Sequence, residues 1–349
     1  MDYHQLGNTE IKIPSIVFGT SALGNLFVEQ PYKTKHEIIR ECINNIAGPI
    51  VLDSAGKYGA GLALEVLGEN LEALGISNHD VIISNKLGWI AKPLKTPEPT
   101  FEPGAWIGLK NDAEQRISYE GILECWEQGN KLLGGRYKPK MVSVHDPDEY
   151  LAAAKDGLDW TNRFDNIVDA YHALAELKKE GKVKAIGVGA KNWKIIRALT
   201  TEVDLDWVMI ANSMTIMKHP TDLLDFISEL HRENIGIINS AVFHSGFLTG
   251  GNYFDYQPTN EDNQKNKELF EYRKTFNLIC EKFTITPAQA CVAFGISPPG
   301  VISIALNTSD PRRVKENIKT VTTKVPAEFW QEMVEARLID ENYPYLPAR

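Results

Sequence analysis

The strongest constraint on the fold is a set of eight short apolar runs, separated by longer segments with helical periodicity. The runs occupy residues 13–20, 49–55, 80–86, 141–146, 183–189, 206–213, 235–242 and 301–307. Each run is nearly continuously apolar rather than alternating, which is typical of a strand buried on both faces. The pattern therefore predicts a parallel sheet covered by helices.

The segments between the runs carry apolar residues three and four positions apart, as amphipathic helices do. The clearest patterns cover residues 35–46, 62–74, 117–133 and 166–182. Thr221, Pro287 and Pro311 suit helix starts, which predicts further helices at 221–233, 287–296 and 311–319. Eight strands that alternate with helices form either a closed (β/α)8 barrel or a doubly wound sheet.

The sequence favours the barrel. A dinucleotide-binding doubly wound sheet needs a G-x-G-x-x-G turn directly after its first strand. The nearest match, Gly187-Val-Gly189, lacks the third glycine and lies deep in the chain. We therefore expect an α/β fold, a single (β/α)8 TIM-barrel domain over residues 1–349. A long loop at 87–116 follows the third strand and is expected to overhang the catalytic face, and residues 249–268 are expected to form a mobile flap.

Composition excludes several functional classes. The net charge is −9 and no basic stripe stands out, so we expect no nucleic-acid partner. No apolar run approaches the roughly 18 residues that span a membrane, and the first residues do not resemble a signal peptide. The four cysteines, Cys42, Cys125, Cys280 and Cys291, have no metal-ligand spacing and are expected to be buried free thiols. These features predict a cytoplasmic protein.

Titratable residues follow three neighbouring strands at the points where those strands end. Asp53 ends the second run, with Tyr58 in the turn after it, and Lys86 and His145 end the third and fourth. Chemistry in barrel enzymes takes place at these carboxyl ends. Each residue alone has an ordinary explanation as a cap, a turn, a surface lysine or a core histidine. Their joint placement instead predicts one catalytic site.

The four residue types are chemically complementary. A free tyrosine has a pKa of about 10, too high for easy proton exchange at neutral pH, and a nearby ammonium lowers it. Asp53 would keep a buried Lys86 charged, and His145 would orient a substrate oxygen. Such a group donates and accepts protons at a carbonyl or alcohol without a metal, so no metal site is expected.

The chain resembles the aldo-keto reductase superfamily. The family's D-x-x-x-x-Y-G motif matches residues 53–59, and its lysine and histidine match Lys86 and His145. The likeness extends from YHQLGNTEIKIPSIVFGTSALG to PRRVKENI and is strongest to the branch of L-fucose (D-threo-aldose) and L-galactose 1-dehydrogenases, through YGAGLALEVLG, VHDPDEY and AIGVGAKNW. The resemblance implies a nicotinamide-dependent oxidoreductase that converts the anomeric hydroxyl of an aldose to a lactone.

The resemblance also implies cofactor contacts around the barrel mouth. They are Gly19, Thr20, Asn192, Asn212, Ser240, Phe243, Ser245, Gly246, Leu248, Asn307, Arg313 and Asn317. Asn192 is expected to hold the nicotinamide carboxamide, to cap a helix, or both. Asn307 stands where NADPH-selective members place a lysine, so the cofactor is expected to be NAD, while Arg312 and Arg313 keep NADP possible.

Substrate contacts are less constrained. Trp89, Trp106 and Tyr119 either stack on a sugar or only anchor the long loop. Lys57, directly before Tyr58, either lowers the pKa of the tyrosine or points to solvent, and we expect solvent. The expected partner is a small sugar or aldehyde, with a monomer or small homo-oligomer as the assembly. The alternatives are an NADPH-dependent aldehyde or ketone reductase on the same residues, a nucleotide-binding barrel without catalysis, and a metal-dependent barrel lyase.

Overall fold

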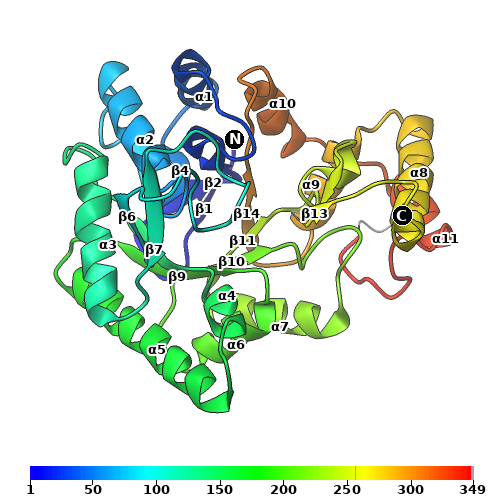
Figure 1. Cartoon of the computed structure of the whole chain (residues 1–349). Coiled ribbons are helices and arrows are strands. Elements are labelled where there is room, and N and C mark those ends of the chain that lie inside the picture. The colour runs from blue at the N-terminus through cyan, green and yellow to red at the C-terminus, as the bar shows by residue number, and fades with distance from the viewer. Residues whose placement is uncertain (256, 347–349) are drawn as a thin grey trace.

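A computed structural model of the chain describes residues 1–255 and 257–346. Eight parallel strands close into a barrel in the order β3, β4, β5, β8, β9, β10, β11, β14, with β14 pairing back onto β3. Their bounds are β3 Ile16–Gly19, β4 Ile50–Ala55, β5 Val81–Leu87, β8 Met141–His145, β9 Ala185–Ala190, β10 Trp207–Ala211, β11 Gly236–Ser240 and β14 Val301–Leu306. Figure 1 shows helices α2, α3, α5, α6 and α7 arranged around these strands.

The predicted TIM barrel is confirmed, and each of the eight apolar runs coincides with one barrel strand, although β5 and β9 each end one residue after their run. The first run was read too long. Ile13 and Pro14 belong to β2 (Lys12–Pro14), which pairs antiparallel with β1 (Tyr3–Gln5), and the barrel strand begins only at Ile16. A continuous apolar run cannot reveal that division, because both strands are buried.

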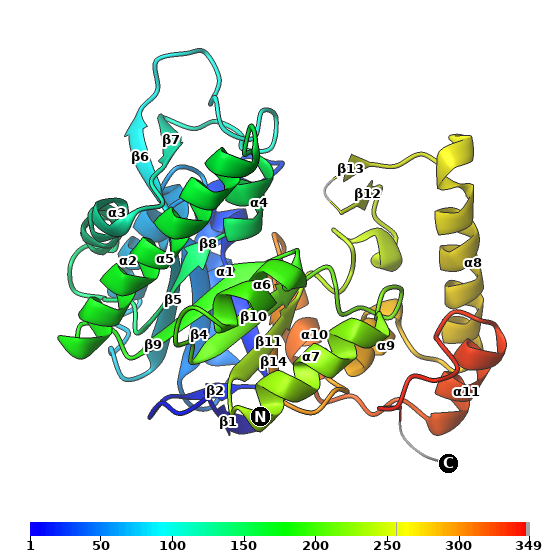
Figure 2. The ribbon, with the colours of Figure 1, turned by 90° about the horizontal axis from the view of Figure 1, so that it is seen from below.

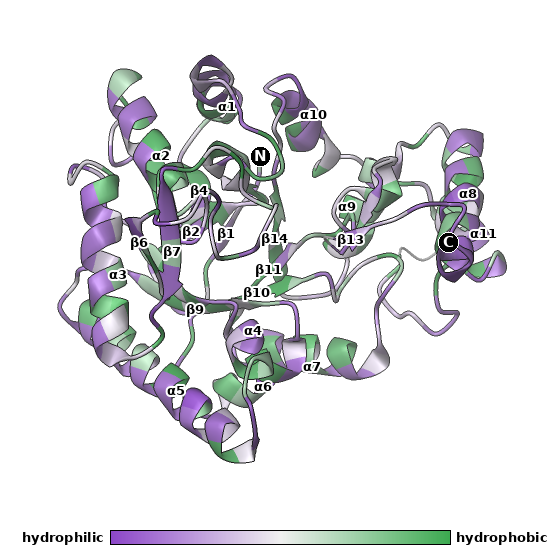
Figure 3. Cartoon of the chain, in the orientation of Figure 1, coloured by the Kyte–Doolittle hydropathy of each residue, from purple (hydrophilic) through white to green (hydrophobic). Residues whose placement is uncertain are grey.

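The seven expected helices are present within a few residues of their predicted bounds, with one exception. They are α1 Tyr32–Asn44, α2 Leu62–Ala73, α3 Tyr119–Leu132, α5 Gly157–Lys179, α7 Thr221–Arg232, α9 Pro287–Gly295 and α10 Arg313–Thr320. Helix α5 begins nine residues before the predicted position 166, because the Asp156 side chain caps it by accepting from the Asp159 N–H. Hydrophobic residues alternate with hydrophilic ones along α3 and α5, as Figure 3 shows.

Beyond the seven helices with predicted bounds, the described residues contain four further α-helices and three 3-10 helices, of which only the start of α6, at the expected Asn192 cap, was anticipated. The α-helices are α4 Pro147–Ala152, α6 Trp193–Thr200, α8 Lys267–Lys282 and α11 Ala327–Glu335. The 3-10 helices are η1 Ser21–Gly24, η2 Phe247–Thr249 and η3 Gln264–Asn266. Helices α8 and α11 pack together outside the barrel (Figures 1 and 2).

The lower end of the barrel is filled by apolar side chains and closed by the β1–β2 hairpin (Figure 2). Trp207 is fully buried there, and a Cβ atom at Gly187 would lie 2.2 Å from its indole ring. Gly187 therefore makes room for Trp207. This packing explains the glycine that made residues 187–189 look like part of a nucleotide-binding turn.

The opposite end carries two excursions. The segment 87–116, predicted as a long loop, contains an antiparallel hairpin of β6 (Trp89–Pro93) and β7 (Asn111–Gln115). The expected flap contains a second small hairpin, β12 (Tyr253–Phe254) and β13 (Gln257–Pro258). Figure 2 shows both hairpins at the end of the barrel away from β1 and β2. The catalytic candidates lie at this end.

Two further expectations concern the chain as a whole. All four cysteines are buried and free, as predicted. In the described part of the chain, no helix combines the length and the apolar character needed to cross a membrane.

Candidate active site

Tyr58 is held at the barrel mouth by the turn between β4 and α2. Gly59 has a φ of +61°, and a Cβ atom there would lie 2.4 Å from the Gly24 carbonyl oxygen. Gly24 itself would bring a Cβ to 2.7 Å from the Tyr58 carbonyl carbon. Only two glycines allow the η1 segment to pass this close to the turn. The contact fixes the backbone from which the tyrosine points inward.

Strand register brings the four predicted residues together. Asp53, Tyr58, Lys86 and His145 form what we call the Tyr58 cluster. Lys86 Nζ donates to the Tyr58 hydroxyl at 3.2 Å and is paired with the Asp53 carboxylate. The other Asp53 oxygen accepts from the Ser84 hydroxyl at 2.9 Å. Lys86 therefore connects a buried carboxylate to the phenol.

The electrostatics of Tyr58 differ from the prediction. Burial raises the pKa of its hydroxyl, and Lys86 lowers it by a smaller amount, so the net pKa lies above the ordinary value. Burial lowers the pKa of Lys86, but Asp53 and Tyr58 together outweigh burial, so the pKa of Lys86 is raised. The lysine is therefore charged and the phenol is protonated at neutral pH. This state suits a proton donor, and Lys86 is placed to stabilise the phenolate once the proton leaves.

His145 completes the cluster from β8. Its ring meets the Tyr58 ring edge-on at a centroid distance of 5.6 Å. Burial, followed by the nearby Lys57 and Lys86, lowers the pKa of His145 well below its ordinary value. Its Nδ1 atom is buried without a hydrogen-bond partner among the described residues, and its Nε2 lies 3.4 Å from Asp146 Oδ2. A neutral imidazole here can donate to a substrate oxygen without adding charge.

Lys57 does not point to solvent, and that expectation was wrong. Its side chain is 4% exposed, and its Nζ lies 2.7 Å from Glu102 Oε1, 3.3 Å from Asp146 Oδ2 and 3.2 Å from Glu149 Oε2. Burial lowers the pKa of Lys57, but the three carboxylates outweigh it and the net pKa is raised. We call these four residues the Lys57 cluster.

The sequence analysis missed the three carboxylates of this cluster. Asp146 directly follows His145 and Glu149 lies one helical turn later, so the HDPDEY segment already held a local signal. Glu102 comes from the long loop, and no local pattern connects it with Lys57. Only the folded chain brings it there.

The three aromatic residues proposed for the substrate have different surroundings. The Trp106 ring lies 5.8 Å from the Tyr58 ring but is only 3% exposed, and its Nε1 donates to Glu102 at 2.6 Å. Trp89 is half-buried, with Lys57 Nζ 5.3 Å from its ring centre. Tyr119 instead bonds Glu176 of α5. The sequence left two roles open, stacking on a sugar or anchoring the long loop. The burial of Trp106 suits loop anchoring, whereas Tyr119 contacts helix α5 instead.

Two amide side chains, Asn192 and Asn212, follow the ends of β9 and β10 at the same end of the barrel. The Asn192 side chain accepts from the Lys194 N–H at 3.1 Å and caps α6. Asn212 is buried in a left-handed conformation (φ +57°), and its Oδ1 has no hydrogen-bond partner in the part of the chain described. A buried amide oxygen without a partner costs free energy, so this atom fits a ligand N–H such as that of a nicotinamide carboxamide.

The end of β11 and the segment after it carry five of the predicted cofactor residues. Ser240 donates to the Ile210 carbonyl at 3.3 Å, and Phe243 is half-buried. Ser245 and Gly246 have left-handed φ values of +58° and +89°. The backbone N–H groups of Gly246 and Leu248 both donate to the Phe243 carbonyl. These two groups would have to leave that carbonyl before they could bind a pyrophosphate.

The remaining predicted cofactor residues lie across the mouth near β3 and β14. Thr20 donates to the Asp53 carbonyl at 3.0 Å, and Asn307 donates to the Ser21 hydroxyl at 2.7 Å. Gly19 packs against Asn307. Arg313 and Asn317 lie on α10, the former exposed and the latter half-buried. Arg312 is paired with Asp310 at 2.6 Å, so Arg313 is the freer cation for a phosphate.

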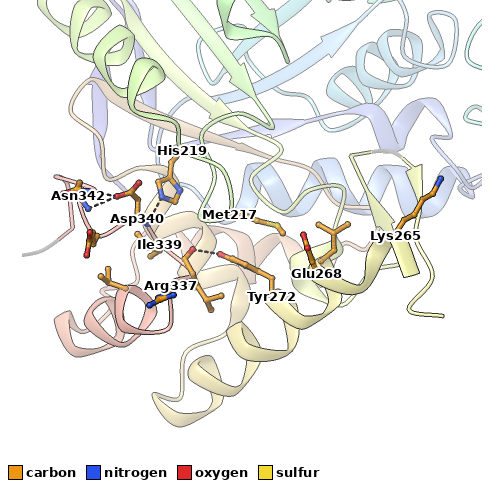
Figure 4. Close-up of a pocket in the computed structure, with 13 residues that line it drawn as sticks. Met217, His219, Lys265, Glu268, Tyr272, Arg337, Ile339, Asp340 and Asn342 are labelled. Carbon is orange, nitrogen blue, oxygen red and sulfur yellow. Dashed lines mark hydrogen bonds between the residues drawn. The ribbon is translucent and has the colours of Figure 1, made fainter. Parts of the chain in front are cut away.

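A cavity of about 860 Å³ lies elsewhere, between the loop after β10, helix α8 and the segment after α11 (Figure 4). Some of its polar groups bond one another. The Asp340 N–H donates to His219 Nε2 at 3.2 Å, and the Tyr272 hydroxyl lies 3.1 Å from the Leu338 carbonyl. The Tyr58 cluster does not line it. The described residues contain no group of three or more His, Cys, Asp or Glu side chains arranged to hold a metal ion.

Comparison with known proteins agrees with this geometry. The model of the aldo/keto reductase family matches residues 15–337. Pyridoxal 4-dehydrogenase of Microbacterium luteolum is 23% identical over 346 residues, which cover 96% of this chain and 97% of that protein. D-threo-aldose 1-dehydrogenase of a Pseudomonas species is 25% identical over 340 residues, which cover 94% and 95%.

A solved structure shows the same fold. The glycerol dehydrogenase of Gluconobacter oxydans superposes with a TM-score of 0.70 at 16% identity, covering 100% of this chain and 99% of that one. The family match, the closed barrel and the residues at its strand ends lead to one conclusion. The chain belongs to the aldo/keto reductase family and is an NAD(P)-dependent oxidoreductase.

Proposed function

We propose that the protein oxidises the anomeric C1 hydroxyl of a neutral aldose to the lactone. The observation that carries the chemistry is the Tyr58 hydroxyl, 3.2 Å from Lys86 Nζ at the barrel mouth. The nicotinamide, when bound, supplies the hydride acceptor. The hydroxyl proton of the sugar passes to Tyr58 while the C1 hydrogen leaves with its electron pair, so that a carbonyl forms at C1.

The other members of the Tyr58 cluster act on that proton transfer. Lys86 stabilises the phenolate form that accepts the proton, and Asp53 keeps Lys86 charged in its buried position. His145, held neutral by its surroundings, donates to the sugar oxygen and orients it. In the direction of carbonyl reduction the same groups act in reverse, with Tyr58 as proton donor.

Two observations support a neutral sugar. D-threo-aldose 1-dehydrogenase is among the relatives that align along nearly the whole chain. In addition, Glu102, Asp146 and Glu149 gather around Lys57, and Glu149 also pairs with Lys191. This excess of carboxylates disfavours an anionic substrate, and carboxylates are acceptors for sugar hydroxyls.

The proposed cofactor contacts are Asn212 for the carboxamide and Asn192 beside it, with Arg313 and Asn317 toward the adenosine end. Asn307, where a lysine would be needed for a 2′-phosphate, is already bonded to Ser21. We therefore propose NAD as the preferred cofactor, with NADP as the alternative. Kinetics with both cofactors test this proposal, and a large preference for NADP would reject it.

The substrate proposal is tested by following NAD⁺ and NADP⁺ reduction with L-fucose, L-galactose, D-arabinose and L-rhamnose. We expect turnover with at least one of these aldoses and a lactone as the product. The absence of nicotinamide reduction with every aldose would reject the sugar proposal.

The buried free thiols suit a protein of the cytoplasm. We propose that the protein acts there as a monomer or small homo-oligomer.

The second candidate is dehydrogenation or reduction of a small aromatic carbonyl compound on the same residues. It is favoured by the similarity to pyridoxal 4-dehydrogenase and by the apolar Trp89 and Phe101 rings near the mouth. Pyridoxal with NAD⁺ and 4-nitrobenzaldehyde with NADPH therefore belong in the same screen. Faster turnover of either compound than of every aldose would favour this candidate.

A further inference from the structure

Lys57 is a buried cation whose partners come from two separate segments. Glu102 belongs to the excursion between β6 and β7, whereas Asp146 and Glu149 lie at the start of α4. All three carboxylates lie within 3.3 Å of its Nζ. The proton transfer at Tyr58 proposed above does not pass through this ion cluster, although Lys57 directly precedes the tyrosine and its charge helps to lower the pKa of His145. A buried lysine with three partners calls for a structural or functional reason.

Glu102 connects Lys57 to Trp106, the aromatic side chain that packs on Tyr58. Its Oε1 lies 2.7 Å from Lys57 Nζ, and its Oε2 accepts from Trp106 Nε1 at 2.6 Å. The Trp106 ring in turn packs on the Tyr58 ring. Glu102 also has a left-handed φ of +44°, a backbone conformation that residues other than glycine adopt at a cost in free energy. Such a conformation persists where neighbouring contacts determine it, and here both carboxylate oxygens are engaged.

Asp146 connects Lys57 to His145 in the way that Glu102 connects Lys57 to Trp106. Its Oδ2 lies 3.3 Å from Lys57 Nζ and 3.4 Å from His145 Nε2, and its φ of +46° is also left-handed. A continuous path of contacts therefore runs from Trp106 through Glu102, Lys57 and Asp146 to His145. The path therefore joins Trp106 and His145, the two side chains whose rings pack against Tyr58.

We propose that Lys57 is a positioning residue that attaches residues 94–110, the excursion between β6 and β7, to α4. It thereby sets the distance between the Trp106 ring and the His145 imidazole. The proposal rests on the function proposed above, because that distance determines how a substrate fits over Tyr58. Lys57 itself does not take part in the proton transfer. Its loss should therefore affect substrate binding more than the chemical step.

The excursion has a second attachment, which limits the expected effect. The Phe27 N–H donates to the Ala105 carbonyl, the Ile107 N–H donates to the Asn25 carbonyl, and Asn25 Nδ2 donates to Ile107 at 3.0 Å. These bonds tie the excursion to the loop after η1 and do not involve Lys57. Removing the lysine should thus loosen the α4 side of the excursion without releasing all of it.

The test compares Lys57→Met, Lys57→Arg and Lys92→Met. Lys92 forms an exposed ion pair with Glu114 in the same hairpin, so its variant controls for loss of a lysine there. One measurement is the rate at which chymotrypsin cleaves the cofactor-free protein after Phe101 and Trp106, which are both buried. The other is the kcat and KM for L-fucose with NAD⁺. Glu102→Gln breaks only the loop side of the cluster and replaces Lys57→Met if that variant does not fold.

We expect Lys57→Met to speed cleavage after Trp106 about fivefold. We expect KM to rise about tenfold while kcat changes less than about threefold. Lys57→Arg should recover part of both effects, and Lys92→Met should behave as the unmodified protein. Unchanged cleavage and KM in Lys57→Met would overturn the proposal. So would faster cleavage without a change in KM, or an equal effect of Lys92→Met.

Failure of this proposal can be told from failure of the proposed function. If the unmodified protein does not oxidise L-fucose, the kinetic measurement uses the best substrate of the screen described above. The cleavage measurement needs no substrate at all. A clamp that holds the excursion would then be seen even if the substrate were not a sugar.

Discussion

Each of three neighbouring barrel strands carries an apolar side chain near its start and a titratable one near its end. Val51 precedes Asp53 on β4, Ile82 precedes Lys86 on β5, and Met141 precedes His145 on β8. The apolar residues belong to the cluster that fills the lower barrel, and the titratable residues gather at the mouth. The comparison shows how one set of strands serves two purposes. Packing at the lower end stabilises the barrel on which the mouth positions its charges.

The largest expected effect tests the mouth. Tyr58→Phe removes the hydroxyl that exchanges the proton but keeps the ring packed against Trp106 and His145. We expect kcat to fall about 10³-fold while nucleotide binding and thermal stability stay close to those of the unmodified protein. Steady-state kinetics, nucleotide titration and thermal unfolding check this. Retained turnover would show that Tyr58 is not the proton carrier.

Lys86 contributes both to the stability of the fold and to the proposed catalysis, so Lys86→Met tests both. The variant leaves the buried Asp53 carboxylate with the Ser84 hydroxyl but without its cation. We expect a loss of stability of about 3 kcal/mol as well as a loss of activity of at least about 10²-fold. Chemical denaturation measures the first and kinetics the second. An Asp53→Asn, Lys86→Met double variant should regain stability but not activity, and recovery of both would contradict the assignment.

The next prediction concerns the lower end alone. Gly187→Ala places a methyl group against the Trp207 ring and should destabilise the fold by about 2 kcal/mol. Gly189→Ala on the same strand is the control, because its Cβ would be 3.7 Å from Met209, an ordinary contact. Denaturation midpoints test the difference. Equal stability of the two variants would mean that the barrel interior is less tightly packed around Trp207 than the distances indicate.

The smallest expected effect is a pH dependence that belongs to the mouth. Burial raises the pKa of Tyr58 above its ordinary value, so the phenolate that accepts a proton is scarce at neutral pH. Oxidation should therefore accelerate by up to about tenfold between pH 7 and 8, whereas reduction should not gain from higher pH. Profiles of kcat/KM in both directions test this. A flat profile for oxidation would place another step or another base in control of the rate.

The barrel and the Tyr58 cluster were predictable because their signals are local. A strand buried on both faces must be apolar throughout, and parallel strands must end at the same edge. Residues at those ends therefore converge whatever the loops do. The hairpin within 87–116 and the early start of α5 were not predicted, since polar pairs and a single capping aspartate leave little periodicity to read.

The sequence by itself thus determined the fold class and the four residues that meet at the mouth, because strand periodicity and register place them. The tertiary structure alone decided the state of Lys57, which the sequence suggested would be solvated and which instead is buried among three carboxylates. The reason is physical. The environment of a charge depends on which distant segments fold over it, and neither Glu102 nor its bond to Trp106 leaves a trace in the residues around position 57.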